Sequence, residues 1–303
     1  MAVVPDTSEF DYLPGQAQAL GIDVPSAERT ALTLPDGRTF SALRFGDGDP
    51  EVTLLHGAGL NAHTWDSVVL LLGRPALAID LAGHGDSSWR VDVDYSPAVL
   101  ADDIARALPA WTARPQVLVG HSLGGLVASI VASEHPELVR ELVLVDIVPG
   151  LDTDAAPAVL REFYAVTDFA SRTDAVDRAQ AFGFGGSRED TERGVFFNTR
   201  VRDDGRVEWK HHFAHIIGSA FDSLKAAHTA SDGDSWAPLA SVAAPITLVR
   251  GERGFLQDAD VAAFTERLPA ADVITVDAGH NVQETAPASL ADIAAGALTR
   301  RAR

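Results

Sequence analysis

The chain has 303 residues, of which 46% are hydrophobic and 22% are charged, and these fractions are typical of a folded globular protein rather than a disordered one. Its 43 acidic residues outnumber 24 lysines and arginines, so the formal net charge is −19 and no nucleic-acid partner is expected. The chain has no cysteine, which excludes disulfides, a thiolate nucleophile and a cysteine-ligated metal.

The N-terminal segment, residues 1–27, carries no motif that we can assign, and we treat it as an extension. Its first ten residues are acidic where a signal peptide would be basic, and no long apolar stretch follows them. No apolar run approaches the roughly 20 residues needed to cross a bilayer. We therefore expect a cytoplasmic protein with no membrane partner.

Short apolar segments recur along the rest of the chain. A hairpin is predicted first, because residues 30–34 and 39–45 are separated by the turn signal Pro35-Asp36-Gly37. Six runs that are apolar on both faces follow, and such runs are typical of strands buried in a parallel sheet that is covered by helices. These runs are residues 52–55, 76–79, 116–119, 141–145, 245–249 and 272–276.

Helical patterns separate these strands. Ser96 and Pro97 supply an N-cap and a first-turn proline for a helix that reaches about Trp111, and others are predicted at 123–135, 258–268 and 287–300. Between 149 and 237 the alternation gives way to helical and loop-rich segments. We therefore predict an α/β fold with a mostly parallel central sheet flanked by helices. The core comprises 28–150 and 238–303, and a mainly helical cap is inserted at 151–237.

The strongest local signal is the sequence Gly-His-Ser-Leu-Gly at residues 120–124. A predicted strand leads directly into it and a predicted helix leads out, which is the arrangement that holds a serine on a tight elbow. Glycines at 120 and 124 allow neighbouring backbone to pass close to the turn. The N-terminus of the helix directs its N–H groups toward negative charge that forms beside Ser122.

Two further stretches accompany this motif: His-Gly-Ala-Gly at 56–59 and Asp-Leu-Ala-Gly-His-Gly-Asp-Ser at 80–87. With them, the chain resembles serine hydrolases of the α/β-hydrolase fold that carry a cap domain. The resemblance covers about 28–150 and 238–300. It implies cofactor-free chemistry in which the backbone N–H groups of Ala58 and Leu123 hold the oxyanion of a tetrahedral intermediate.

A serine hydroxyl needs an adjacent base to act as a nucleophile. Of the ten histidines, His280 lies in the loop after the strand at 272–276, where the resemblance places the catalytic base. His56 and His84 are expected to be structural. The side chain of His121 is expected to point away from the reacting serine.

The acid departs from the commonest pattern of the family. The resemblance places it in a Gly-x-x-Asp stretch after the strand at 245–249, but this chain has Gly-Glu-Arg-Gly at 251–254. Some relatives carry the acid one strand earlier, where this chain has Asp146. We therefore predict Asp146 as the acid, since a carboxylate on either strand can orient the histidine. The alternatives are that Glu252 or Asp258 supplies the acid, or that serine and histidine act as a dyad without one. In these cases Asp146 would be a hydrogen-bonded residue at the end of a strand.

Three cap histidines raise the question of a metal. His211 and His215 would share one face of a helix. Zinc helices of that spacing carry glutamate after the first histidine, whereas this chain carries His212. We predict no metal site and expect these side chains to pack in the cap or to face the substrate.

These residues together predict an ester hydrolase that needs no cofactor. Ser122 attacks a carbonyl, His280 transfers the proton and Asp146 orients His280. An aromatic and aliphatic cap favours a small or medium, largely apolar carboxylic ester or lactone as substrate. Two alternatives stay open: carbon–carbon bond hydrolysis, lyase or cofactor-independent oxygenase chemistry on the same residues, and a ligand-binding protein with poor turnover.

Overall fold

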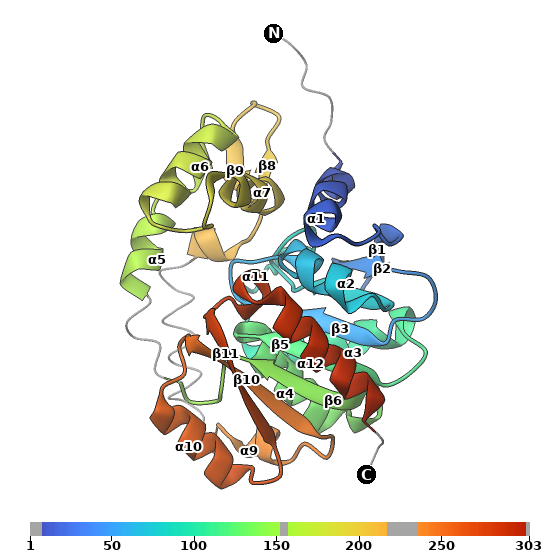
Figure 1. Cartoon of the computed structure of the whole chain (residues 1–303). Helices are drawn as coiled ribbons and strands as arrows, with labels where there is room; N and C mark the ends of the chain where they lie inside the picture. The colour runs from blue at the N-terminus through green and yellow to red at the C-terminus, as the bar shows by residue number, and fades with distance from the viewer. Residues whose placement is uncertain (1–7, 152–156, 217–234, 301–303) are drawn as a thin grey trace.

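An eight-stranded sheet forms the centre of the computed structural model, which describes residues 8–151, 157–216 and 235–300 (Figure 1). The strand order is β1-β2-β4-β3-β5-β6-β10-β11. β2 pairs antiparallel with β1 and β4, and every other neighbouring pair is parallel. The hairpin and the six apolar runs are therefore confirmed as one mostly parallel sheet. Its strands are β1 (Ala27–Thr33), β2 (Thr39–Phe45), β3 (Val52–Leu55), β4 (Ala76–Asp80), β5 (Gln116–His121), β6 (Val139–Val145), β10 (Ile246–Arg253) and β11 (Asp272–Gly279).

Helices cover both faces of this sheet, and each face buries its own apolar cluster. Every residue of β3, β4 and β5 is buried, which explains why these strands lack alternation. One face carries α3 (Pro97–Trp111), α4 (Leu123–Glu134), α9 (Ala237–Ala240) and α10 (Asp258–Arg267). The other carries α1 (Leu13–Leu20), α2 (Asp66–Leu72), α11 (Val282–Thr285) and α12 (Pro287–Thr299).

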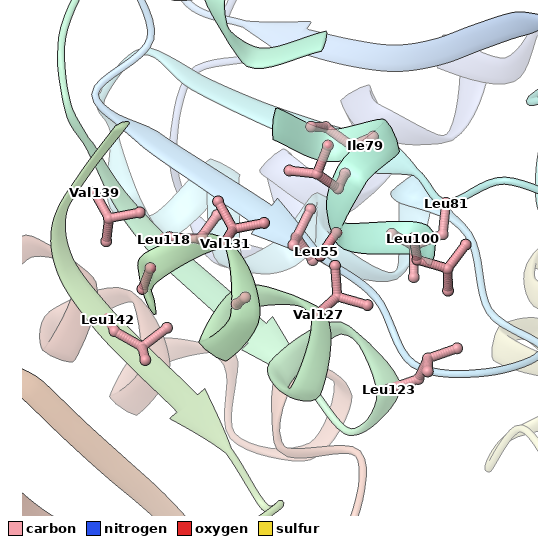
Figure 2. Packing of buried hydrophobic residues seen from close by; sticks show 14 of the residues in the cluster. Leu55, Ile79, Leu81, Leu100, Leu118, Leu123, Val127, Val131, Val139 and Leu142 are labelled. Carbon is pink, nitrogen blue, oxygen red and sulfur yellow. The ribbon is translucent and has the colours of Figure 1, made fainter. Parts of the chain in front are cut away.

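The helix α4 fixes the position of the elbow that precedes it. Figure 2 shows Val127 and Val131 of α4 with Leu55 of β3 and Leu118 of β5, all members of one buried cluster. Each of these four side chains is 0% exposed. Burying each aliphatic side chain of this size stabilises the folded state by about 1.5–3 kcal/mol relative to leaving it exposed. The first turn of α4, and the residue before it, are thereby held against the end of the sheet.

The N-terminal segment packs on the core. A 3₁₀ helix (Glu9–Tyr12) leads into α1, whose Leu13 and Ala17 belong to the buried cluster of the α2 face. The Glu9 carboxylate lies 2.6 Å from the Arg29 guanidinium and 3.0 Å from Nε2 of His63. The predicted boundary at residue 27 stays a prediction, and residues 1–7 lie outside the described part of the chain.

The segment predicted as a cap separates β6 from β10, although these strands are neighbours in the sheet (Figure 1). Its described residues include the helices α5, α6 and α7 and a further helical turn at 213–216. They also form a small antiparallel sheet of order β7-β9-β8, which the sequence pattern did not predict. Residues 152–156 and 217–234 of the predicted cap lie outside the described residues. These elements are α5 (Pro157–Phe163), β7 (Asp168–Phe169), α6 (Arg172–Ala181), α7 (Arg188–Asn198), β8 (Thr199–Val201) and β9 (Val207–Trp209).

The helices within the described ranges fall short of the length and apolar character that a bilayer crossing requires.

Candidate active site

Ser122 stands on a strained turn between β5 and α4. Its φ of 50° and ψ of −120° are a conformation that residues with a side chain rarely adopt. The Ser122 N–H donates to the Val145 carbonyl at 3.1 Å, which ties the turn to β6. A Cβ at Gly120 would lie 2.3 Å from the Gly124 carbonyl oxygen, so the predicted need for a small residue there is confirmed. The turn leaves Ser122 partly exposed at the end of β5.

The Asp146 carboxylate lies directly beside the predicted base. Its Oδ2 is 2.7 Å from Nδ1 of His280, and the Asp146 side chain is 0% exposed. The carboxylate also accepts the backbone N–H of Gly251 at 3.0 Å and of Phe255 at 2.7 Å. When His280 is neutral, Asp146 selects the tautomer that carries its proton on Nδ1. The Nε2 atom is then free to accept a proton.

Gly254, at the position where the commonest family pattern has an acid, complements Asp146. A Cβ at Gly254 would lie 2.3 Å from both carboxylate oxygens of Asp146. Glycine therefore leaves the space that the carboxylate from β6 occupies. The alternative acids Glu252 and Asp258 are exposed, and Asp258 is paired with Arg250 at 2.7 Å. In the described structure, His280 contacts neither of them.

Loops from three strands meet at the elbow. Burial holds the pKa of His121 well below its ordinary value, and its neutral ring donates from Nε2 to the His280 carbonyl at 3.0 Å. His121 thus links the elbow to the loop after β11. On the other side, a Cβ at Gly57 would lie 3.2 Å from Cβ of Ser122. The loop after β3 therefore packs directly on the serine.

The loop after β3 carries one of the two predicted oxyanion donors. Ala58 is exposed, and its N–H makes no hydrogen bond to any described residue. The Leu123 N–H is at the first position of α4, where helices have no intrahelical acceptor. Both N–H groups are therefore available to an oxygen atom that is placed beside Ser122. Their role stays a prediction.

Two buried histidines hold this loop, as expected. Nε2 of His56 accepts the Leu81 N–H at 3.0 Å, and its Nδ1–H donates to the Gly57 carbonyl at 2.8 Å. Nε2 of His84 accepts the Gly59 N–H at 3.1 Å. Burial lowers the pKa of His56 to about 4 and that of His84 to about 3. Both rings are therefore neutral at pH 7, and each fixes one end of the loop.

Phe255 is a site residue that the sequence reasoning did not identify. Its ring stacks on the His280 ring with centroids 3.6 Å apart and planes 11° apart, while its N–H binds Asp146. The ring thus restricts the orientation of His280. No local pattern points to this residue, because the contact depends on how the loop after β10 closes over β11.

Cap residues reach the loop after β3. The hydroxyl of Tyr164 lies 3.0 Å from the point where a side chain at Gly59 would begin, and ring atoms of Phe213 and His211 lie 3.8 and 3.9 Å from it. Among the described residues, no group of three side chains could hold a metal ion. His211 is buried, whereas His215 is exposed and packs near Trp89. The sequence pattern points to His211 as a candidate cap residue, whereas nothing in it singles out Tyr164.

Comparison with known proteins identifies relatives over nearly the whole chain. A family model described as the alpha/beta hydrolase fold matches residues 50–287. The chain is 35% identical over 304 residues to the esterase Rv0045c of Mycobacterium tuberculosis, covering 97% of this chain and 96% of that protein. A solved structure of that esterase aligns with a TM-score of 0.80 over 97% of this chain and 100% of its own. A pimeloyl-acyl-carrier-protein methyl ester esterase of Aeromonas salmonicida is 31% identical, covering 78% of this chain and 90% of that protein.

Proposed function

The chain belongs to the α/β-hydrolase family and is an ester hydrolase, and we propose that it works through an acyl-enzyme on Ser122. One observation carries this proposal. The buried Asp146 carboxylate binds Nδ1 of His280 at 2.7 Å, and the His280 loop is hydrogen-bonded to the elbow that presents Ser122. A serine, a histidine and a carboxylate in this order form the constellation that activates a hydroxyl nucleophile.

In the proposed reaction, Ser122 Oγ attacks the ester carbonyl carbon while Nε2 of His280 accepts the hydroxyl proton. Asp146 stabilises the resulting imidazolium through the Nδ1–H bond. The N–H groups of Ala58 and Leu123 donate to the oxyanion of the tetrahedral intermediate. His280 then returns the proton to the departing alcohol. Water, deprotonated by His280, releases the acid and restores the serine.

The proposed substrate is a small or medium, largely apolar carboxylic ester or lactone. Support comes from the aromatic side chains around the site: Phe255 lies on His280, while Tyr164 and Phe213 lie over Gly59. Apolar walls with a few polar groups are typical of sites for small organic ligands. Each step uses only side chains and backbone of this chain and water.

Turnover of p-nitrophenyl acetate and butyrate by the wild type and by Ser122→Ala tests the proposal. Loss of the nucleophile is expected to lower kcat by about 10³-fold or more. Ser133→Ala, on the same helix and away from the elbow, is the matched control and is expected to keep wild-type rates. Equal rates for wild type and Ser122→Ala would exclude the acyl-enzyme. Turnover of another substrate class that survives Ser122→Ala but not His280→Ala would favour lyase or oxygenase chemistry.

A further inference from the structure

Three buried histidines lie in a row beside the loop after β3, and they differ in their hydrogen bonding. The His56 and His84 rings are 5.1 Å apart, and the His84 and His211 rings are 6.1 Å apart. His56 and His84 are paired at both ring nitrogens. His211 is only 1% exposed, yet its Nε2 has no hydrogen-bond partner among the described residues. A buried polar atom without a partner is rare in native proteins, so this one requires an explanation.

The hydrogen bonds of His211 identify the unpaired atom as a donor. Its Nδ1 accepts the Ala214 N–H at 3.1 Å and therefore carries no proton. Burial and the neighbouring histidines keep the pKa of His211 well below its ordinary value, so the ring is neutral and Nε2 carries the proton. Within the described part of the chain, the cap therefore holds a buried N–H group without an acceptor.

The segment that carries His211 is anchored to the core. The His212 N–H donates to the Gly83 carbonyl at 2.7 Å, and the Trp89 indole N–H donates to the Lys210 carbonyl at 2.7 Å. These contacts lie on both sides of His211 in the sequence and place it without using its own side chain. The unpaired donor is therefore preformed and does not result from a loosely held loop.

Tyr164 supplies a second polar group at the same place. Its ring packs edge-on against the His211 ring at 5.0 Å, and its hydroxyl faces Gly59. This hydroxyl forms no hydrogen bond with any described residue. Gly59 has a φ of 75°, and a Cβ there would lie 3.0 Å from the hydroxyl. A side chain at position 59 would therefore crowd the Tyr164 hydroxyl, and glycine avoids this contact.

The order of the strands shows which part of a substrate these two groups face. β3 lies on one side of β5, whereas β6, β10 and β11 lie on the other. Gly59 follows β3 and His280 follows β11, so Ser122 stands between them. The alcohol must lie beside His280, which protonates it as it leaves. The group beside Gly59 therefore belongs to the acyl part.

We propose that Tyr164 and His211 form a polar subsite for the acyl chain, and that the preferred acyl chain carries a neutral acceptor oxygen such as a ketone or an ether. This inference rests on the acyl-enzyme proposed for Ser122. Both groups donate, which suits an oxygen acceptor. None of the described contacts of the two side chains involves a charged group, and the nearby Lys210 is paired with Asp86 at 2.9 Å. A carboxylate would lack a counter-ion there.

Matched pairs of esters test the subsite: p-nitrophenyl 4-oxopentanoate against pentanoate, and 5-oxohexanoate against hexanoate. The measured quantity is the ratio of kcat/KM within each pair, corrected for the ratio of hydroxide-catalysed rates. In the wild type, at least one keto ester is expected to be preferred by about tenfold, which one buried hydrogen bond can supply. Tyr164→Phe and His211→Phe should remove the preference, and His211→Gln, which keeps an N–H donor, should restore part of it. His215→Phe, an exposed histidine four residues on, should keep it.

If the wild type, Tyr164→Phe and His211→Phe all hydrolyse the four esters with the same corrected kcat/KM ratio, the proposed subsite is contradicted. A preference that follows an oxygen in the alcohol part would overturn the acyl assignment. If no ester is turned over, the proposed function fails separately. Calorimetric binding of methyl 5-oxohexanoate and methyl hexanoate to the Ser122→Ala protein then decides the subsite, since tighter binding of the keto ester supports it and equal binding contradicts it.

Discussion

The two sides of Ser122 differ in how their polar groups are paired. On the β6–β11 side, the Asp146 carboxylate accepts three hydrogen bonds, from His280, Gly251 and Phe255. On the cap side, Nε2 of His211 lacks a partner among the described residues. A fully paired group keeps one orientation in the free protein, as a proton relay requires. In the proposed subsite, the unpaired donor is left to pair with the acyl chain of a substrate.

The largest expected effect breaks the paired side. Asp146→Asn should lower kcat for p-nitrophenyl butyrate by about 10³-fold or more, because an amide neither stabilises the imidazolium nor holds the same tautomer of His280. The circular dichroism spectrum should be unchanged. Asp258→Asn, which removes an exposed carboxylate, is the control and should keep wild-type kcat. Near-wild-type activity in Asp146→Asn, with loss in Asp258→Asn, would move the acid to the loop after β10.

A smaller effect is expected when the carboxylate is displaced rather than removed. A Cβ at Gly254 would lie 2.3 Å from the Asp146 oxygens, so Gly254→Ala forces the carboxylate to move. Overpacking of this kind typically lowers the free energy of unfolding by about 1–3 kcal/mol. Because the displaced carboxylate no longer holds His280 in place, kcat is also expected to fall by about tenfold or more. Urea unfolding and steady-state kinetics measure the two quantities.

Gly194→Ala is the matched control for this substitution. Nothing lies within 4 Å of a Cβ at Gly194, which is in the helix α7, so alanine there should leave kcat unchanged. Unchanged stability and kcat in Gly254→Ala would show that the space beside Asp146 does not depend on glycine.

The smallest effect concerns the neutral histidines that hold the loop after β3. Burial lowers the pKa of His56 to about 4 and of His84 to about 3, whereas the unfolded chain protonates both near pH 6.5. Their contribution to stability is therefore complete above pH 6.5 and declines as the pH falls, by up to about 1.4 kcal/mol per pH unit for each ring. His63 does not add to this slope below pH 6. Although burial lowers its pKa, the Asp66 and Glu9 carboxylates raise it to about 9. Below pH 6, His63 is therefore protonated in both the folded and the unfolded chain.

Urea unfolding at pH 5.0, 5.5, 6.0 and 7.0 measures this slope. The slope gives the number of protons taken up on unfolding, and His84→Gln should reduce that number by about one. His135→Gln, which changes an exposed histidine, should leave the slope unchanged. The same slope in His84→Gln and the wild type would contradict neutral burial of His84.

Much of the fold and of the chemical centre could be predicted because the signals are local. The strands from β3 to β6 are apolar on both faces. The elbow could be predicted from the glycines at 120 and 124, because a Cβ at either position would collide with neighbouring backbone. Asp146 could be identified as a candidate by its place at the end of β6. The hydrogen bond from His280 depends on packing between strands that are distant in sequence, and only the structure contains it.

The remaining features lack a local signal. The cap strands β7, β8 and β9 have two or three residues each, too few to show a period of two. The docking of α1 depends on Leu13 and Ala17 entering a cluster built from distant helices. Tyr164 and His211 meet beside Gly59 only because α5 and the segment after β9 converge there. Contacts of this kind follow from tertiary packing rather than from sequence pattern.

Covalent labelling with a fluorophosphonate tests the assignment of Ser122 most directly, because the probe reacts with an activated serine. Wild-type protein and Ser122→Ala are incubated with the probe, weighed intact by mass spectrometry and then mapped as peptides. We expect one adduct per wild-type chain, on the peptide that contains Ser122, and none on Ser122→Ala. An unlabelled wild type, or an equal adduct on Ser122→Ala, would contradict the role of Ser122 as the nucleophile.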